Sequence, residues 1–185
     1  MTADAILSLM RTSYRSRFRA AFGSEPSLDL TANALAAYLR TIVDGDSPFD
    51  RYAAGDASAL SESARRGLVL FQEKAGCGQC HSGPNLTDEQ FHNTGVAWRT
   101  GVLTDEGHGG GAFKTPTLRE ISLTAPYMHD GSISTLAQVI DYYDSGGQEN
   151  PSLDSSLRPL HLSPAEKQDI QAFLTSLDGH IREGP

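Results

Sequence analysis

Apolar side chains recur along this chain at the three- and four-residue spacing of amphipathic helices. Residues 3–20 predict a first helix with a basic end, and the turn at 23–26 ends it. Residues 31–43 predict a second helix, whose inward face follows the i, i+3, i+4, i+7 pattern through Leu35, Tyr38, Leu39 and Ile42. The alternation typical of strands is weak throughout. The pattern therefore predicts an all-α protein.

Capping residues mark three further helices. Ser61 predicts the N-cap of a helix over 61–74, and Ser134 or Thr135 begins another that continues to residue 143. The last helix has the clearest start, because residues 163–166 read Ser-Pro-Ala-Glu, an N-cap, a first-turn proline and the glutamate of a capping box.

Composition narrows the classes of function. The 185 residues carry a formal charge of −8 with a pI near 5.1, which argues against nucleic-acid binding, because phosphates require a basic surface. No run of eighteen apolar residues occurs, so no membrane-spanning helix is expected. The negative charge would allow a basic redox protein to bind as a partner. The alternative is that the charge only keeps the protein soluble.

The chemistry is carried by one short motif, Cys77-Gly78-Gln79-Cys80-His81. A CxxC pair followed at once by His is typical of covalent haem attachment rather than of a disulfide or a thiol redox site. The two thiols would form thioether bonds to one edge of the porphyrin, and His81 would bind the iron as its proximal ligand. We therefore expect one covalently bound haem c and redox chemistry.

The predicted haem also accounts for the long loop at 82–133, which is unusual inside a compact domain. Loops can wrap a large rigid cofactor and use it as part of their core. We expect a cytochrome c-like domain with long loops over 31–178, preceded by a helical connection at 1–30 and followed by a tail at 179–185.

Two side chains compete for the sixth position on the iron. Met128 lies in a loop after the haem motif, where many small cytochromes place a methionine ligand. Tyr143 completes the inward face of its predicted helix, where it would serve equally as a core aromatic side chain. Tyr142 is turned about 100° from that face and is expected to be exposed.

Three segments after the haem motif, at 91–96 (Phe-His-Asn-Thr-Gly-Val), 113–119 (Phe-Lys-Thr-Pro-Thr-Leu-Arg) and 124–131 (Thr-Ala-Pro-Tyr-Met-His-Asp-Gly), follow one another in a recognisable order. With this order, the chain resembles the C-terminal half of bacterial di-haem cytochrome c peroxidases, and MauG-like members most closely. The resemblance extends from about residue 30 almost to the C-terminus. It implies that residues 1–30 are the end of an inter-domain connection.

The resemblance assigns roles to several residues. It implies that Tyr143 is the sixth iron ligand, as in MauG-like members, and that Met128 is not. His129 resembles the family's histidine near the haem, with a role in orienting a propionate or relaying charge, or a purely structural one. Thr124 and Pro126 match positions whose carbonyls bind calcium between the two domains of the family.

Two basic residues, Lys114 and Arg119, match positions that would neutralise haem propionates, with a solvated surface role as the alternative. The chain departs from the family in having one CxxCH motif, because the second lies in an N-terminal haem domain that reacts with peroxide. We therefore expect the electron-transfer half of a di-haem oxidoreductase, in which peroxide-linked chemistry requires that N-terminal domain.

Two alternative functions stay open at this stage. The chain could be a stand-alone mono-haem electron carrier working with a donor or acceptor protein, or a haem-based sensor, which carbon monoxide binding would reveal. Residues 1–10 lack the basic and apolar regions of a secretion signal, whereas haem attachment to CxxCH takes place outside the cytoplasm. We expect a periplasmic protein whose leader was removed, or a piece of a longer chain.

Overall fold

The computed structural model describes residues 2–182, which divide into two compact units. The first contains residues 2–43 together with 181–182, and the second is Asp44–His180. The division after residue 43 groups the predicted helix at 31–43 with the N-terminal segment. The functional boundaries expected at residues 30 and 178 stay predictions.

The first unit begins with two helices where the sequence predicted one. Helices α1 (Ala3–Ser13) and α2 (Arg15–Phe22) are separated at Tyr14, whose φ of −119° and ψ of 4° are not helical. The hydroxyl of Thr12 donates to the carbonyl oxygens of Ser8 and Leu9, at 2.9 and 3.3 Å, which weakens the end of α1. The continuous helix over 3–20 was therefore a wrong prediction.

Helix α3 (Leu28–Leu39) begins earlier than expected, because Ser27 caps it by accepting a hydrogen bond from the Leu30 amide at 3.2 Å. Its predicted inward face is exposed in the described part of the chain. Leu35 is 59% exposed, Tyr38 51% and Leu39 62%. Within the first unit, helix α3 therefore presents an apolar stripe.

The second unit contains four α-helices among its described residues: α4 (Pro48–Ala53), α5 (Glu62–Gln72), α6 (Leu136–Asp144) and α7 (Pro164–Thr175). The predicted N-caps at Ser61, Thr135 and Ser163 are confirmed. Each side chain accepts a hydrogen bond from the backbone N–H of the residue three positions later. Helix α4 was not predicted, although Ser47 and Asp50 form a reciprocal capping box around Pro48. It is only six residues long, too short for a periodic signal.

The segment between α5 and α6 contains brief regular structure within its loops. Two 3₁₀ turns occur, η1 (Cys77–Gln79) and η2 (Ile121–Leu123). Strand β1 (Phe91–His92) pairs antiparallel with β4 (Phe113–Lys114), and β2 (Trp98–Arg99) pairs with β3 (Val102–Leu103). Each strand has two residues, so the described chain is predominantly helical with two minimal strand pairs.

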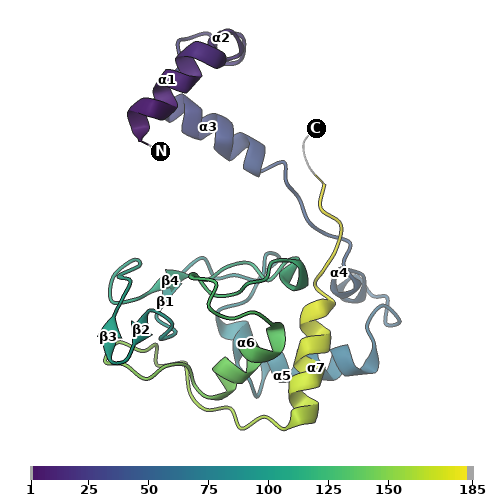
Figure 1. Ribbon diagram of the computed structural model, residues 1–185. Helices are drawn as coiled ribbons and strands as arrows, with labels where there is room; N and C mark the ends of the chain where they lie inside the picture. The colour runs from purple at the N-terminus through teal and green to yellow at the C-terminus, as the bar shows by residue number, and fades with distance from the viewer. Residues whose placement is uncertain (1, 183–185) are drawn as a thin grey trace. The chain divides into compact units, whose positions relative to one another are not determined.

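Packing of α5 against α7 forms the centre of the second unit (Figure 1). The rings of Phe71 and Phe173 lie 5.0 Å apart, and Phe49 meets Phe173 edge-on at 5.5 Å. Gly67 allows the close approach, because a Cβ atom there would lie 1.9 Å from the carbonyl oxygen of Asp169. Only glycine fits at this crossing.

Within residues 2–182, none of the helices combines the length and the apolar character that crossing a membrane requires.

A pair of acidic side chains lies where the chain enters the second unit. Both carboxylate oxygens of Asp44 are buried without a hydrogen-bond partner among the described residues, and Glu120 is 7% exposed. Burial, and then the neighbouring Glu120 carboxyl, raise the pKa of Asp44 to about 6. The Arg119 guanidinium opposes this shift only in part. Two ionised carboxylates cannot hydrogen bond each other, since each only accepts.

This pair predicts a loss of stability at neutral pH. Because the folded pKa of Asp44 lies above its unfolded value, its stabilising contribution is complete below about pH 4 and is lost as the pH rises through about 6. Asp44→Asn should therefore raise the free energy of unfolding by about 1–2 kcal/mol at about pH 7.5, and change it little at about pH 4. Denaturant unfolding at both pH values measures this difference. An equal effect at the two pH values would contradict it.

Candidate haem site

A cavity of about 410 Å³ lies in the second unit and brings together most of the residues singled out in the sequence. This volume lies in the range of small-molecule and cofactor pockets. Its apolar lining includes Val96, Leu118, Val139 and Leu160, from segments far apart in the sequence. Cys77, Cys80, His81 and Tyr143 also face it.

The two cysteines are presented by the tight turn η1, directly after α5. Gly76 begins this turn with a φ of 66°, a left-handed conformation that glycine adopts readily. Both side chains are free thiols, and both line the cavity. Burial raises the pKa of Cys77 to about 11, and burial followed by the charges of Asp88 and Asp154 raises the pKa of Cys80. Both sulfurs are therefore protonated at neutral pH, so neither is a ready-made thiolate nucleophile.

His81 is oriented by a backbone contact. Its Nδ1 lies 3.0 Å from the carbonyl oxygen of Leu86, which fixes Nδ1 as the hydrogen-bond donor and leaves Nε2 as the free nitrogen. Burial lowers the pKa of His81, so the ring is neutral. A neutral imidazole held by such a second contact is the usual form of a histidine metal ligand.

Both candidates for the sixth position on the iron reach this cavity. Tyr143 lies on α6, and burial raises the pKa of its phenol. Met128 lines the cavity from a loop, with a φ of 70°. The structure therefore brings Tyr143 and Met128 to one site, and the choice between them stays a prediction from the family resemblance.

Tyr142 does not behave as the helical pattern predicted. Its hydroxyl donates to the carbonyl oxygen of Thr94 at 2.8 Å and accepts from the Gln148 amide at 3.1 Å, and its side chain is half-buried. The prediction that Tyr142 is exposed was wrong, because the distant loop at Thr94 and the turn that follows α6 both contact its hydroxyl.

Of the remaining predicted residues, four reach the cavity: Lys114, Thr124, Pro126 and His129. Lys114 forms an ion pair with Glu89 at 2.5 Å. The ring of His129 stacks on Phe113 at a centroid distance of 3.6 Å and an interplanar angle of 9°. Thr124 and Pro126 border the same cavity, and their role in calcium binding stays a prediction.

Arg119 is not among the described residues that line the cavity. Its Nη1 donates to Asp50 of α4 at 2.7 Å, and its Nε and Nη2 donate to the Pro84 carbonyl oxygen at 3.0 and 2.6 Å. All three contacts join α4 to the loop after the haem motif. The geometry therefore gives Arg119 a structural role and no support to its predicted contact with a propionate.

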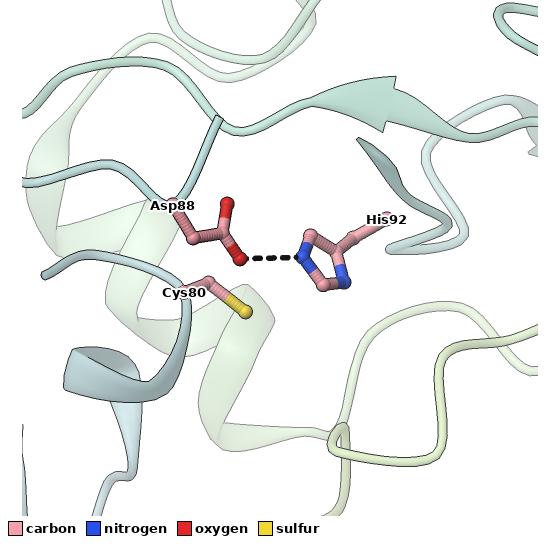
Figure 2. Close-up of side chains that lie close together, drawn as sticks. All are labelled: Cys80, Asp88 and His92. Carbon is pink, nitrogen blue, oxygen red and sulfur yellow. Dashed lines mark hydrogen bonds and ion pairs between the residues drawn. The ribbon is translucent and has the colours of Figure 1, made fainter. Parts of the chain in front are cut away.

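Sequence reasoning missed a cluster beside Cys80. His92 lies between two carboxylates, with Nε2 2.9 Å from Asp88 and Nδ1 2.5 Å from Asp154. Figure 2 shows the Cys80 sulfur next to the hydrogen bond that joins Asp88 to His92. Asp88 and His92 are four residues apart in a predicted loop, where that spacing does not bring side chains together, and the contact with Asp154 spans 62 residues, so neither contact left a local signal.

This set of residues fits a covalently bound haem. Two adjacent thiols, a neutral histidine with one free nitrogen, and a buried phenol or thioether face one mostly apolar cavity. These are the groups that c-type haem attachment and iron binding require.

Comparison with known proteins agrees with this chemistry. A family model described as di-haem cytochrome c peroxidase matches residues 2–58. The methylamine utilization protein MauG of Methylorubrum extorquens is 41% identical, in an alignment covering 96% of this chain and 53% of that protein. The cytochrome-c peroxidase IdrP1 of Pseudomonas sp. strain SCT is 37% identical over 89% of this chain and 53% of its own length. The chain thus spans about half the length of these curated relatives.

Solved structures show the same relationship. A MauG-like protein associated with microbial copper homeostasis superposes with a TM-score of 0.79 and 33% identity, over 96% of this chain and 62% of that one. The di-haem peroxidase BthA of Burkholderia thailandensis shares the fold, with a TM-score of 0.72 and 19% identity over 96% of this chain and 59% of its own. Together, the sequence and fold similarities show that this chain belongs to the family of bacterial di-haem cytochrome c peroxidases and MauG proteins.

Proposed function

We propose that this chain is the electron-transfer half of a di-haem oxidoreductase of the cytochrome c peroxidase and MauG type. The observation that carries the proposal is the single cavity that gathers Cys77, Cys80, His81 and Tyr143. The lengths of the relatives support it, since this chain aligns with about half of each. Peroxide-linked oxidation of a donor would then require an N-terminal haem domain.

Each residue has a distinct task in this proposal. Cys77 and Cys80 hold the cofactor by thioether bonds, and His81 offers Nε2 to the iron while Leu86 fixes its ring. A bound haem supplies an iron that accepts and returns one electron. Tyr143, as a phenolate, would add a hard anionic donor that favours ferric and higher oxidation states over the ferrous state.

The surroundings of the cavity suit electron transfer. Apolar side chains exclude water, which strengthens the electrostatic influence of nearby charges on the iron. Lys114 and His129 border the cavity and would meet the charged edge of the cofactor. Thr124 and Pro126 would add carbonyl oxygens to a calcium site completed by the N-terminal domain.

Helix α3 supports the presence of a partner domain. Its stripe of Leu35, Tyr38 and Leu39 is exposed within the first unit, and neighbouring large apolar side chains on a surface are a mark of interaction sites. An N-terminal haem domain would cover this stripe. The wider proposal includes a periplasmic location, where haem c is attached, and a separate redox protein as electron donor or acceptor.

The ligand assignment predicts a spectroscopic difference between two variants. Tyr143→Phe should change the ferric absorption and electron paramagnetic resonance spectra, because it removes an iron ligand. Met128→Leu, from the same cavity, should leave both spectra unchanged. The reverse result would make Met128 the ligand and would point to an ordinary electron carrier.

The function itself is tested by the size and haem content of the native protein. Intact mass spectrometry of the protein from its own periplasm should find a product of about twice this length, with two covalently attached haems. A product of this length with one haem would instead support a mono-haem carrier. A product without covalent haem would overturn the haem assignment altogether.

A further inference from the structure

The contact between His92 and two carboxylates has no role in the function proposed above. His92 lies in β1, Asp88 in the loop that follows the haem motif, and Asp154 in the loop between α6 and α7. Both ring nitrogens of His92 are engaged, at 2.9 Å to Asp88 and 2.5 Å to Asp154. All three side chains are mostly shielded, with 18–24% of their surface exposed.

Each carboxylate is fixed by contacts of its own. Asp88 donates its backbone N–H to the Cys80 carbonyl oxygen at 2.8 Å, and its Oδ1 accepts from the Gln90 amide at 2.9 Å. Asp154 donates its N–H to the Asn93 carbonyl oxygen at 2.9 Å. Its Oδ1 accepts from the amide and hydroxyl of Ser156, at 2.9 and 2.7 Å. The second oxygen of each carboxylate, Oδ2, contacts His92.

The charge of this cluster follows from its contacts. Burial disfavours a charged imidazole, but the hydrogen bonds and charges of Asp154 and Asp88 outweigh it and raise the pKa of His92. Burial raises the pKa of both carboxyl groups, but the Gln90 amide and then His92 lower that of Asp88 to about 2, and His92 and then Ser156 lower that of Asp154. With His92 protonated, the cluster holds one positive and two negative charges, a net charge of −1.

The cluster lies against a residue that anchors the haem. The Cys80 sulfur and one ligand atom each of Asp88 and His92 all lie within 4.8 Å of one another. Figure 2 shows these three side chains close together. His92 and Asp154 also line the cavity itself. Among the charged neighbours, Lys114 is neutralised by Glu89, and His81 is neutral. A metal ion is a poorer occupant, because His92 has no free nitrogen and Cys80 would carry the thioether.

We propose that His92 is a positioning residue that holds a proton between Asp88 and Asp154 at the Cys80 edge of the haem, and thereby sets the reduction potential and its pH dependence. This inference rests on the proposed haem function. Reduction adds one electron to the iron and leaves every bond to the ring intact. The added negative charge favours the proton on His92, so reduction takes up a proton from solvent wherever His92 is partly deprotonated.

Substitutions that change the charge of the cluster should shift the reduction equilibrium of the haem. A more negative cluster should disfavour reduction, and a less negative one should favour it. His92→Gln makes the cluster net −2 and should lower the equilibrium constant for reduction about tenfold, whereas Asp154→Asn makes it neutral and should raise that constant by a similar factor. A loss of packing alone would expose the haem in both variants and shift both potentials the same way. Asp88→Asn repeats the second change if Asp154→Asn does not fold.

The measurement is a spectroelectrochemical titration of the haem-loaded full-length protein between about pH 6 and 9. As the pH rises and His92 loses its proton, the reduction potential of the wild-type protein should fall. This fall in potential should be absent in His92→Gln. His108→Gln is the matched control, because His108 stacks on Phe91 at 3.9 Å and does not line the described cavity.

Two results would overturn the inference: equal shifts for the His92 and Asp154 variants, or an unchanged pH dependence in His92→Gln. A wild-type protein with covalent haem and a reversible potential would leave the proposed function intact in either case. Failure of the proposed function is recognised separately, by the mass and haem count of the native protein, and failure of the haem assignment by a wild-type protein that carries no covalent haem.

Discussion

The close crossing of α5 and α7 is the constraint on which the site depends. At Gly67 the two backbones approach so closely that a single added Cβ would lie 1.9 Å from the Asp169 carbonyl oxygen. Phe71, one turn further along α5, packs on Phe173 and also lies 6.5 Å from the His81 ring. Because the haem motif follows within a few residues of the end of α5, the position of that helix determines where the thiols can be.

The rest of the site is assembled by loops, through one local contact and two that run over long sequence distances. The Leu86 carbonyl orients His81, the Thr94 carbonyl receives Tyr142, and Arg119 joins α4 to the Pro84 carbonyl. Regular structure contributes little here, since each of the described strands has only two residues. A cofactor pocket of this kind is therefore specified by individual backbone carbonyls rather than by the register of a sheet.

Sequence reasoning succeeded where the physical cause is local. The caps at Ser61, Thr135 and Ser163 depend on side chains three residues from the amides that they bind, and the haem motif lies within five consecutive residues. It failed where the cause is distant. The covering of Tyr142 by Thr94, the pairing of Arg119 with Asp50 and the contact of His92 with Asp154 join residues 48 to 69 positions apart.

The apolar stripe on α3 has a consequence for handling the protein. Leu35, Tyr38 and Leu39 lie within five residues, so a short helix displays three large water-exposed side chains on neighbouring turns. Where nothing covers such a surface, copies of the chain will tend to self-associate through it as their concentration rises. The net charge of −8 opposes that tendency only at low ionic strength, because salt screens charge repulsion and leaves apolar attraction in place. The tendency of this chain to associate is therefore influenced by a helix remote in sequence from the candidate haem site.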